Sequence, residues 1–451
     1  MGKNIFISVL GTNNYIPCNY YYPDSPEAEK VEAVRFVQEA VLRLEASKGN
    51  SIDKAIVYLT EEAEKKNWHN NGHMDRDGNS IEVEGLASRL EKAGILSQPV
   101  KIKSGRSEDE IWEIFNTIVE TVDEGCNLWI DITHSFRSLP LIMLAVINYL
   151  KMLKGVNVKQ ICYGAMEVLG DFRTVEAMDI TERDVPIFDL THFNTILEWS
   201  HAINDFRMSG NASMIHSLSY SGVLPLLKAS RGQNKGAVFI RMFAERLDRL
   251  CNVLGCNRGP ELANASDQLL ASLSATGDGT IEGILPPLVP FFNIIRSDFQ
   301  SFRGDTLDRG IAAAKWCLEH NFVPQGYTIL QESIITWCLE KLNEETEMVS
   351  KREAVSSAFV IRQKGIEYDD WNSNAKEYQD IIENLHSMEW FSELALPMDI
   401  LSQQRNNINH AGYDANNRQR AEKLKTHLED SITEITNVKQ AYDTACKDCD
   451  T

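Results

Sequence analysis

The chain has 451 residues, which predicts two to four domains at roughly 100–200 residues each. Hydrophobic residues make up 43% and charged residues 24%, as in ordinary globular proteins, so the composition excludes wholesale disorder. The formal charge of −20 argues against a protein that coats duplex DNA or an anionic membrane through bulk electrostatics. A small basic site on an acidic body remains compatible with this charge.

The sequence predicts a cytoplasmic protein with no membrane partner. The longest apolar run, residues 139–150, is interrupted by Pro140 and Asn148 and is shorter than the roughly 20 residues that a span requires. The N-terminus has no signal-peptide layout. The nine cysteines are scattered, which is typical of reduced thiols, and the CxxC of Cys446 and Cys449 has no second pair. We therefore expect no bound metal.

The first 185 residues alternate between strand and helix patterns. Apolar runs predict strands at 4–10, 55–60, 99–102, 127–133 and 158–165. Helical spacing predicts helices at 27–46, 84–95, 106–123 and 138–154. This alternation is typical of a Rossmann-like domain with a parallel sheet, and the polar insertion 67–80 is expected to be a loop.

Beyond about residue 190 the strand signal disappears. Helical spacing predicts helices at 192–208, 238–254, 311–320, 325–343 and 415–440. The predicted fold class is therefore α/β plus all-α. We expect a Rossmann-like domain over 1–185, a helical connector over 186–305 and an all-helical domain over 306–451.

A first group of polar residues lies where the predicted strands end. The sequence DITHSFRSLP closes the strand at 127–133 and opens the next helix. Ligands bind outside the carboxyl ends of parallel strands, and a helix N-terminus favours anions. The candidate ligand-binding residues are Gly11, Thr12, Asn13, Asn14, Thr60, Asp131, Thr133, His134, Ser135, Arg137 and Ser138.

A purely structural interpretation stays open for this group, because Ser138 could cap a helix while Asp131 and His134 satisfy local backbone groups. The dinucleotide fingerprint GxGxxG and the Walker motif GxxxxGK[ST] are absent from the sequence. Nicotinamide cofactors and ATP are therefore poor candidates.

DITHSFRSLP closely resembles the Asp-x-Thr-His-Gly signature of CRISPR-associated proteins that carry a CARF domain. LGTNNY after the first strand, VYLTEEA at the end of the second and the YGA of the fifth strand add to this resemblance. The resemblance implies a dimer that binds cyclic oligoadenylate across its seam, with cyclic tetra-adenylate favoured. Ser135 stands where the signature has Gly, which leaves the ring size open.

A second group, RNNINH, contains Arg405, Asn406 and His410. Taken alone it is compatible with a polar helix end that Gly412 terminates. RNNINH fits the Arg-x4-His motif of HEPN ribonucleases, and 316–337 resembles the helices that precede that motif in the family. The order of the two motifs resembles that of CRISPR-associated ancillary ribonucleases in type III antiviral defence. The resemblance implies endonucleolytic cleavage of single-stranded RNA, switched on by the cyclic ligand.

The chemistry of the second group follows from its residue types. Histidine can take and return a proton near neutral pH, and arginine offers permanent charge in a fork that matches phosphate. Asn406 shares a helix face with His410, whereas Arg405 lies roughly 140° away at about 100° per residue. A composite site at a two-fold seam of a homodimer, or a higher homo-oligomer, is therefore expected.

We expect metal-independent cleavage that leaves 2′,3′-cyclic phosphate ends, without a cofactor and without DNA as a partner. Two alternatives stay open. The first domain could degrade the cyclic ligand as a ring nuclease with Thr133, Ser135 or Arg137, or the chain could be a catalytically silent regulator that binds cyclic oligoadenylate.

Overall fold

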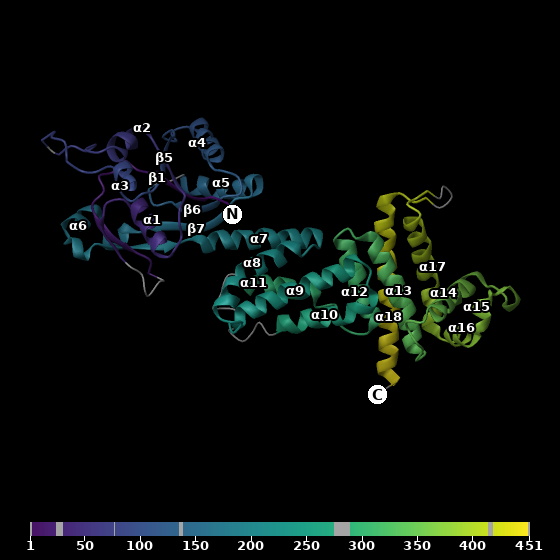
Figure 1. The fold of residues 1–451 in the computed structure, drawn as a ribbon. Helices are drawn as coiled ribbons and strands as arrows, with labels where there is room; N and C mark the ends of the chain where they lie inside the picture. The colour runs from purple at the N-terminus through teal and green to yellow at the C-terminus, as the bar shows by residue number, and fades with distance from the viewer. Residues whose placement is uncertain are drawn as a thin grey trace. The chain divides into compact units, whose positions relative to one another are not determined.

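A computed structural model gives the fold and describes residues 2–23, 30–75, 77–134, 139–274, 289–413 and 418–449. The chain forms two compact units, residues 1–195 and 196–451. Figure 1 shows strands and helices together in the first unit and helices in the second. The predicted class, α/β plus all-α, is confirmed.

The first unit is built on an eight-stranded sheet with the order β3-β2-β8-β7-β6-β1-β4-β5. Its strands are β1 (Asn4–Leu10), β2 (Cys18–Tyr21), β3 (Val31–Val34), β4 (Lys54–Leu59), β5 (Ser97–Lys101), β6 (Asn127–Asp131), β7 (Asn157–Gly164) and β8 (Asp184–Asp189). The neighbours β7, β6, β1, β4 and β5 run parallel. Read from β5 to β7, the spatial order is β5-β4-β1-β6-β7. If these five strands are numbered along the chain, the order is 3-2-1-4-5, which is the Rossmann order.

The remaining three strands extend the parallel part of the sheet into a mixed sheet. β8 is antiparallel to β7, and β2 is antiparallel to β3. Residues 31–34 lie inside the helix predicted over 27–46, but they form β3, and the helix begins only at Val37. Ala33 has a φ of 54°, which breaks the alternation of the strand. Val31 and Val34 consequently both pack against the same core, and their spacing of three positions resembles a helix face.

Helices cover both faces of the sheet. They are α1 (Val37–Ser47), α2 (Glu61–Ala63), α3 (Leu86–Lys92), α4 (Glu108–Thr121), α5 (Leu139–Lys154) and α6 (Phe172–Ala177), with a π-helical turn at Glu64–Trp68 and 3₁₀ turns at Met166–Leu169 and Ile180–Glu182. Successive residues of β1 point to opposite faces, as in any strand. Phe6 and Leu10 pack in the core with α1 and α3, whereas Ile5 and Ile7 pack in the core with α4 and α5.

The second unit is helical throughout its described residues. Its helices, with the one that leads into it, are α7 (Thr191–Ser209), α8 (Ser213–Ala229), α9 (Lys235–Gly255), α10 (Gly259–Ser274), α11 (Val289–Phe299), α12 (Thr306–Glu319), α13 (Val323–Lys341), α14 (Val349–Lys364), α15 (Ser373–Glu377), α16 (Gln379–His386), α17 (Glu389–Asn409) and α18 (Ala421–Cys449), with a 3₁₀ turn at Tyr368–Asp370. The five helices predicted from spacing correspond to α7, α9, α12, α13 and α18. The predicted division of the chain at residue 305 stays a prediction.

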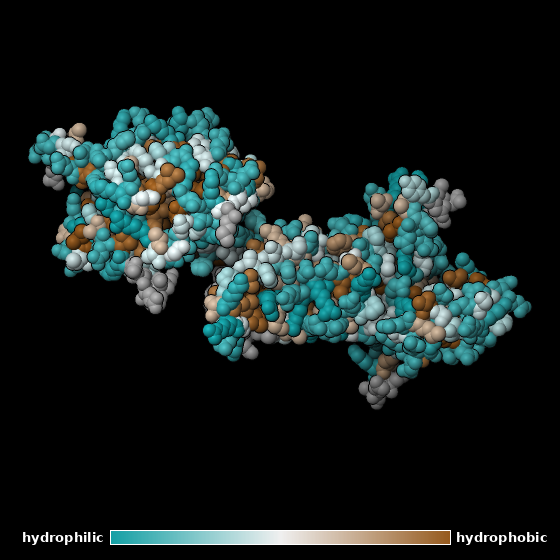
Figure 2. Space-filling view, viewed as in Figure 1, coloured by the Kyte–Doolittle hydropathy of each residue, from teal (hydrophilic) through white to brown (hydrophobic). Residues whose placement is uncertain are grey.

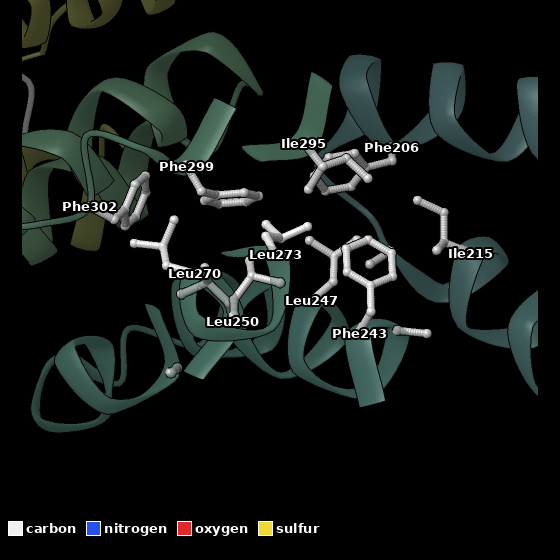
Figure 3. Close-up of a cluster of buried hydrophobic side chains, with 14 of the residues drawn as sticks. Phe206, Ile215, Phe243, Leu247, Leu250, Leu270, Leu273, Ile295, Phe299 and Phe302 are labelled. Atoms are coloured by element: carbon white, nitrogen blue, oxygen red, sulfur yellow. The ribbon is translucent and has the colours of Figure 1, made fainter. Parts of the chain in front are cut away.

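Two apolar cores hold this unit together. In the first, aromatic and aliphatic side chains from α7, α9, α10 and α11 point toward one another, among them Phe206, Phe243 and Phe299 (Figure 3). The second core joins α12, α13, α14, α17 and α18, and it buries Met398 and Leu401 of α17. Because these α17 residues lie one turn apart, they fix the helix that carries Arg405 and His410 against its neighbours.

Hydrophilic residues cover much of the visible surface of each unit, with separate apolar patches between them (Figure 2). In the described part of the chain, no helix combines the length and the apolar character that crossing a bilayer would require.

Candidate ligand site and catalytic site

The first candidate site lies where β1 and β6 end. Along the chain, β1 and β6 are the first and fourth of the five parallel strands, yet they are neighbours in the sheet. The direction in which successive strands are added therefore reverses between them. A doubly wound sheet binds its ligands at this point, outside the carboxyl ends of the strands. Gly11–Asn14 directly follow β1, and Ile132–His134 directly follow β6. The fold therefore brings the two predicted loops to one edge of the sheet.

Asp131 organises the end of β6 from a fully buried position. Its carboxylate accepts hydrogen bonds from the Ser8 hydroxyl at 2.7 Å and from the Thr133 hydroxyl at 2.5 Å. The Thr133 hydroxyl also accepts the backbone N–H of Gly164 at the end of β7, at 2.8 Å. Burial raises the pKa of Asp131, and the hydrogen bonds from Thr133 and Ser8 oppose that shift. This network joins β1, β6 and β7 immediately beneath the candidate site.

The Thr133 hydroxyl is engaged by the fold, and a role of Thr133 in ligand binding stays a prediction. Its hydroxyl donates to Asp131 and accepts from the N–H of Gly164, so both its donor and its acceptor function are used within the protein. The side chain of Gln38, buried in α1, extends the network by donating to the Ser8 hydroxyl at 3.1 Å. Asp131 and Thr133 thus shape the rim of the site from below.

The loop after β1 is held by Asn67 of the polar insertion and by Arg35, which lies two residues before α1. The Asn67 amide donates to the backbone carbonyls of Gly11 and Asn13, both at 2.9 Å. Arg35 donates to the side-chain oxygen of Asn14 at 3.0 Å and to the carbonyl of Tyr15 at 3.1 Å. The loop is therefore fixed before any ligand arrives, which lowers the entropy that binding would cost.

His134 and Tyr15 form an aromatic pair between the two loops. Their ring centroids lie 4.2 Å apart and the rings are inclined by 26°, which is a stacked arrangement. Burial lowers the pKa of His134 to about 4, so the imidazole is neutral at physiological pH. A neutral imidazole offers an anionic ligand a hydrogen-bond donor without a full positive charge.

The other predicted residues of this site divide into three groups. Thr12 is half-buried, and Asn13 and Asn14 are exposed on the loop. Thr60 is buried and caps α2, because its hydroxyl accepts the N–H of Ala63 at 3.2 Å, so the structure gives it a capping role at the end of β4. Ser135, Arg137 and Ser138 lie outside the described residues.

The second candidate site lies at the C-terminal end of α17. Arg405 and Asn406 belong to the last turns of the helix, and His410 is its C-cap, with its N–H donated to the carbonyl of Asn406 at 3.0 Å. Asn406 and His410 are exposed, whereas Arg405 is half-buried. The helix stops because Ala411 and Gly412 both have left-handed φ values. His410 therefore faces solvent at a helix end.

The side chain of Arg405 is directed toward α13, where it forms an ion pair with Glu332. The Arg405 Nη1 donates to Oε1 of Glu332 at 3.0 Å, while the Nε of Arg405 is buried without a hydrogen-bond partner. Arg352 of α14 donates to the other carboxylate oxygen of Glu332 at 2.7 Å. The carboxylate of Glu332 thus lies between two guanidinium groups that belong to two other helices.

The sequence patterns did not single out Tyr15, Asn67 or Glu332, although each lies in or beside a segment that they marked. The signal for Glu332 is an acidic residue in the largely uncharged stretch ILQESIITW of a core helix. An acid in such a position normally has a buried or half-buried cationic partner. Across the described residues, the structure has no cluster of three His, Cys, Asp or Glu side chains that could hold a metal ion.

Comparison with known proteins links the chain to CRISPR-associated proteins. It is 26% identical over 259 residues to a CRISPR-associated protein of Methanocaldococcus jannaschii. The match covers 56% of this chain and 36% of that protein, so the chain spans about a third of the length of this relative. No protein-family profile matches the chain.

Proposed function

We propose that this protein is an endoribonuclease of the CARF–HEPN kind, in which cyclic oligoadenylate binds at the β1/β6 edge and activates cleavage of single-stranded RNA at the end of α17. The observation that carries the proposal is the arrangement of the two motifs. One lies at the ligand-binding edge of a Rossmann-ordered sheet, and the other places an exposed histidine and an arginine at the end of one helix. Relatedness to a CRISPR-associated protein supports it.

The proposed reaction needs no metal. A histidine removes the proton from the RNA 2′-hydroxyl, whose oxygen attacks the adjacent phosphorus, and the bond from phosphorus to the 5′-oxygen breaks. The leaving 5′-oxygen takes up a proton, so the products carry a 2′,3′-cyclic phosphate and a 5′-hydroxyl. Arg405 stabilises the negative charge that develops on the phosphate oxygens. His410 exchanges the protons, and its exposed position leaves room for RNA to reach it.

The proposed working form is a homodimer. Arg405 is directed at α13, while His410 lies exposed five residues later at the helix end. Because one helix does not aim both side chains at one phosphate, a second copy that brings its own pair would complete the site. The side-chain amide of Asn406, which shares a helix face with His410, then orients the phosphate or the imidazole.

A surface of the first unit supports a second copy. Helix α5 exposes an apolar stripe at Leu141, Ala145, Tyr149 and Met152, and Leu141 and Met152 are 72% and 79% exposed. The helix contains no acidic residue. A second copy of a chain with a charge of −20 can approach this face without strong like-charge repulsion.

The test is an RNA-cleavage assay on the purified full-length protein. Labelled single-stranded RNA is incubated with each ring size of cyclic oligoadenylate, with and without EDTA, beside Arg405→Ala and His410→Ala. We expect one ring size to activate cleavage, EDTA to leave the rate unchanged, and both variants to lose it. Loss of the cyclic ligand without any RNA cleavage would instead identify a ring nuclease, and binding without either reaction would identify a regulator.

A further inference from the structure

Glu332 occupies an unusual position for a glutamate, because it bridges two arginines on two different helices. Its Oε1 accepts from Arg405 of α17 at 3.0 Å, and its Oε2 accepts from Arg352 of α14 at 2.7 Å. All three side chains are at least partly buried, with exposed fractions between 21% and 35%. Charge-assisted bonds at this depth restrict the carboxylate far more than surface ion pairs would.

Arg352 is the fixed end of this cluster. Its guanidinium donates to the Thr336 hydroxyl at 2.9 Å, to the backbone carbonyl of Thr346 at 2.8 Å and to the backbone carbonyl of Glu332 at 3.1 Å. These three hydrogen bonds fix the orientation of the Arg352 guanidinium. Its remaining contact, with the Glu332 carboxylate, fixes that carboxylate relative to α13.

Arg405 is the member of the cluster that belongs to the candidate catalytic site. One Nη1 bond joins it to Glu332, and its Nε is buried without a partner. A guanidinium has five N–H donors, so a single bond to Glu332 leaves donors for another acceptor. The two arginines and one glutamate together keep one net positive charge, which a phosphate requires.

We propose that Glu332 is a positioning residue for the RNA cleavage proposed above: it holds the Arg405 guanidinium in one orientation toward the scissile phosphate, and Arg352 holds Glu332. The inference rests on the proposed function and adds a residue to its site. A free arginine side chain populates many rotamers, and ordering it in advance removes that entropic cost from the transition state. Glu332 acts through Arg405 and has no contact with the RNA.

Positioning and simple electrostatics predict opposite results when Glu332 is replaced. Removing its negative charge makes the surroundings of Arg405 more positive, so electrostatics alone predicts tighter RNA binding and equal or faster cleavage. Positioning predicts that kcat falls, because the transition state loses a correctly placed guanidinium. It also predicts that KM changes little, because ground-state binding of RNA uses many phosphates.

The experiment compares Glu332→Ala and Glu332→Gln with Glu344→Gln in the full-length protein. Glu344 is a matched control, because its side chain is 34% exposed against 35% for Glu332 and it pairs with Lys351 at 2.8 Å, apart from Arg405. With labelled RNA and the activating ring size at saturation, we expect Glu332→Ala to lower kcat by about 10- to 100-fold with KM within about threefold. Glu344→Gln should retain the kcat of the wild type.

Chemical rescue separates positioning from a merely structural role. Added guanidinium ion should restore part of the activity of Arg405→Ala, because Glu332 can hold the small cation in place of the side chain. The double variant Glu332→Ala/Arg405→Ala should not be rescued. If Glu332→Ala fails to fold, the same comparisons are made with Glu332→Gln, which keeps the shape of the side chain.

The outcomes distinguish this inference from the function on which it rests. A wild-type protein that cuts no RNA with any ring size overturns both. An active wild type whose folded Glu332 variants match Glu344→Gln in kcat, or whose rescue by guanidinium is independent of Glu332, overturns only the inference. Loss of kcat in the Glu332 variants together with loss of rescue supports it.

Discussion

Replacing Thr133 by valine tests whether the Asp-x-Thr segment shapes the ligand site from below. Valine keeps the shape of the side chain but removes the hydroxyl that donates to Asp131 at 2.5 Å and accepts from the Gly164 N–H at 2.8 Å. A hydrogen bond to a charged group contributes about 1.5–3 kcal/mol, and a buried N–H left without an acceptor costs about 1–3 kcal/mol. Allowing for relaxation, we expect Thr133→Val to lower the free energy of unfolding by about 2–4 kcal/mol.

The matched control is Thr133→Ser, which keeps the hydroxyl and loses one methyl group, at a cost of about 1 kcal/mol. Urea unfolding gives the free-energy difference between the two variants. Hydrogen exchange of the Gly164 amide gives a local reading, and this amide should lose protection in the valine variant only. If the valine variant is as stable as the serine variant and protects Gly164 equally, the network does not have the role assigned to it here.

Three further predictions concern His134, Asn67 and Gly310. The pKa of His134 is about 4 in the folded protein and about 6.5 in the unfolded chain. The neutral imidazole therefore stabilises the fold above pH 6.5, and this stabilisation is lost as the pH falls toward 4. Between pH 7 and pH 5 the loss in the free energy of unfolding is at most about 2 kcal/mol. His134→Phe, which keeps the stack on Tyr15, should remove that part of the pH dependence in thermal denaturation, and an unchanged pH profile would refute it. Asn67→Ala should free the loop after β1 and weaken binding of the activating cyclic oligoadenylate by about 10-fold in calorimetry, and unchanged affinity would contradict it. Gly310→Ala should destabilise the second unit by about 1–3 kcal/mol, because the new Cβ would come within 2.3 Å of the Ser333 Cβ. A variant of wild-type stability would show that α12 and α13 can move apart at little energetic cost.

The strands that flank the candidate ligand site could be predicted because burial dominates their sequence. β1 and β6 are short apolar runs followed by polar residues, and a parallel sheet brings such endings to one edge. The three additional strands β2, β3 and β8 could not be recognised in the same way. The left-handed φ of Ala33 disrupts the alternation on which a strand prediction depends.

The residue types of the candidate sites could be predicted, but their hydrogen-bonding partners could not. The motif DITHSF marked Thr133 as a possible ligand donor, whereas the fold engages its hydroxyl with Asp131 and Gly164. Glu332 lies 73 positions before Arg405 in the chain, so no local spacing links the two residues. Only the packing of α13 against α17 brings them together, and such long-range contacts leave no periodic trace in a single sequence.

The most direct test of the proposed function is the rate of RNA cleavage in the presence of EDTA, measured with and without cyclic oligoadenylate. The account predicts that the wild type cuts labelled single-stranded RNA only when one ring size is present, at a rate that EDTA does not change. His410→Ala, folded and of the same oligomeric state, should cut none. Cleavage that EDTA abolishes, or that persists in folded His410→Ala, would contradict the account.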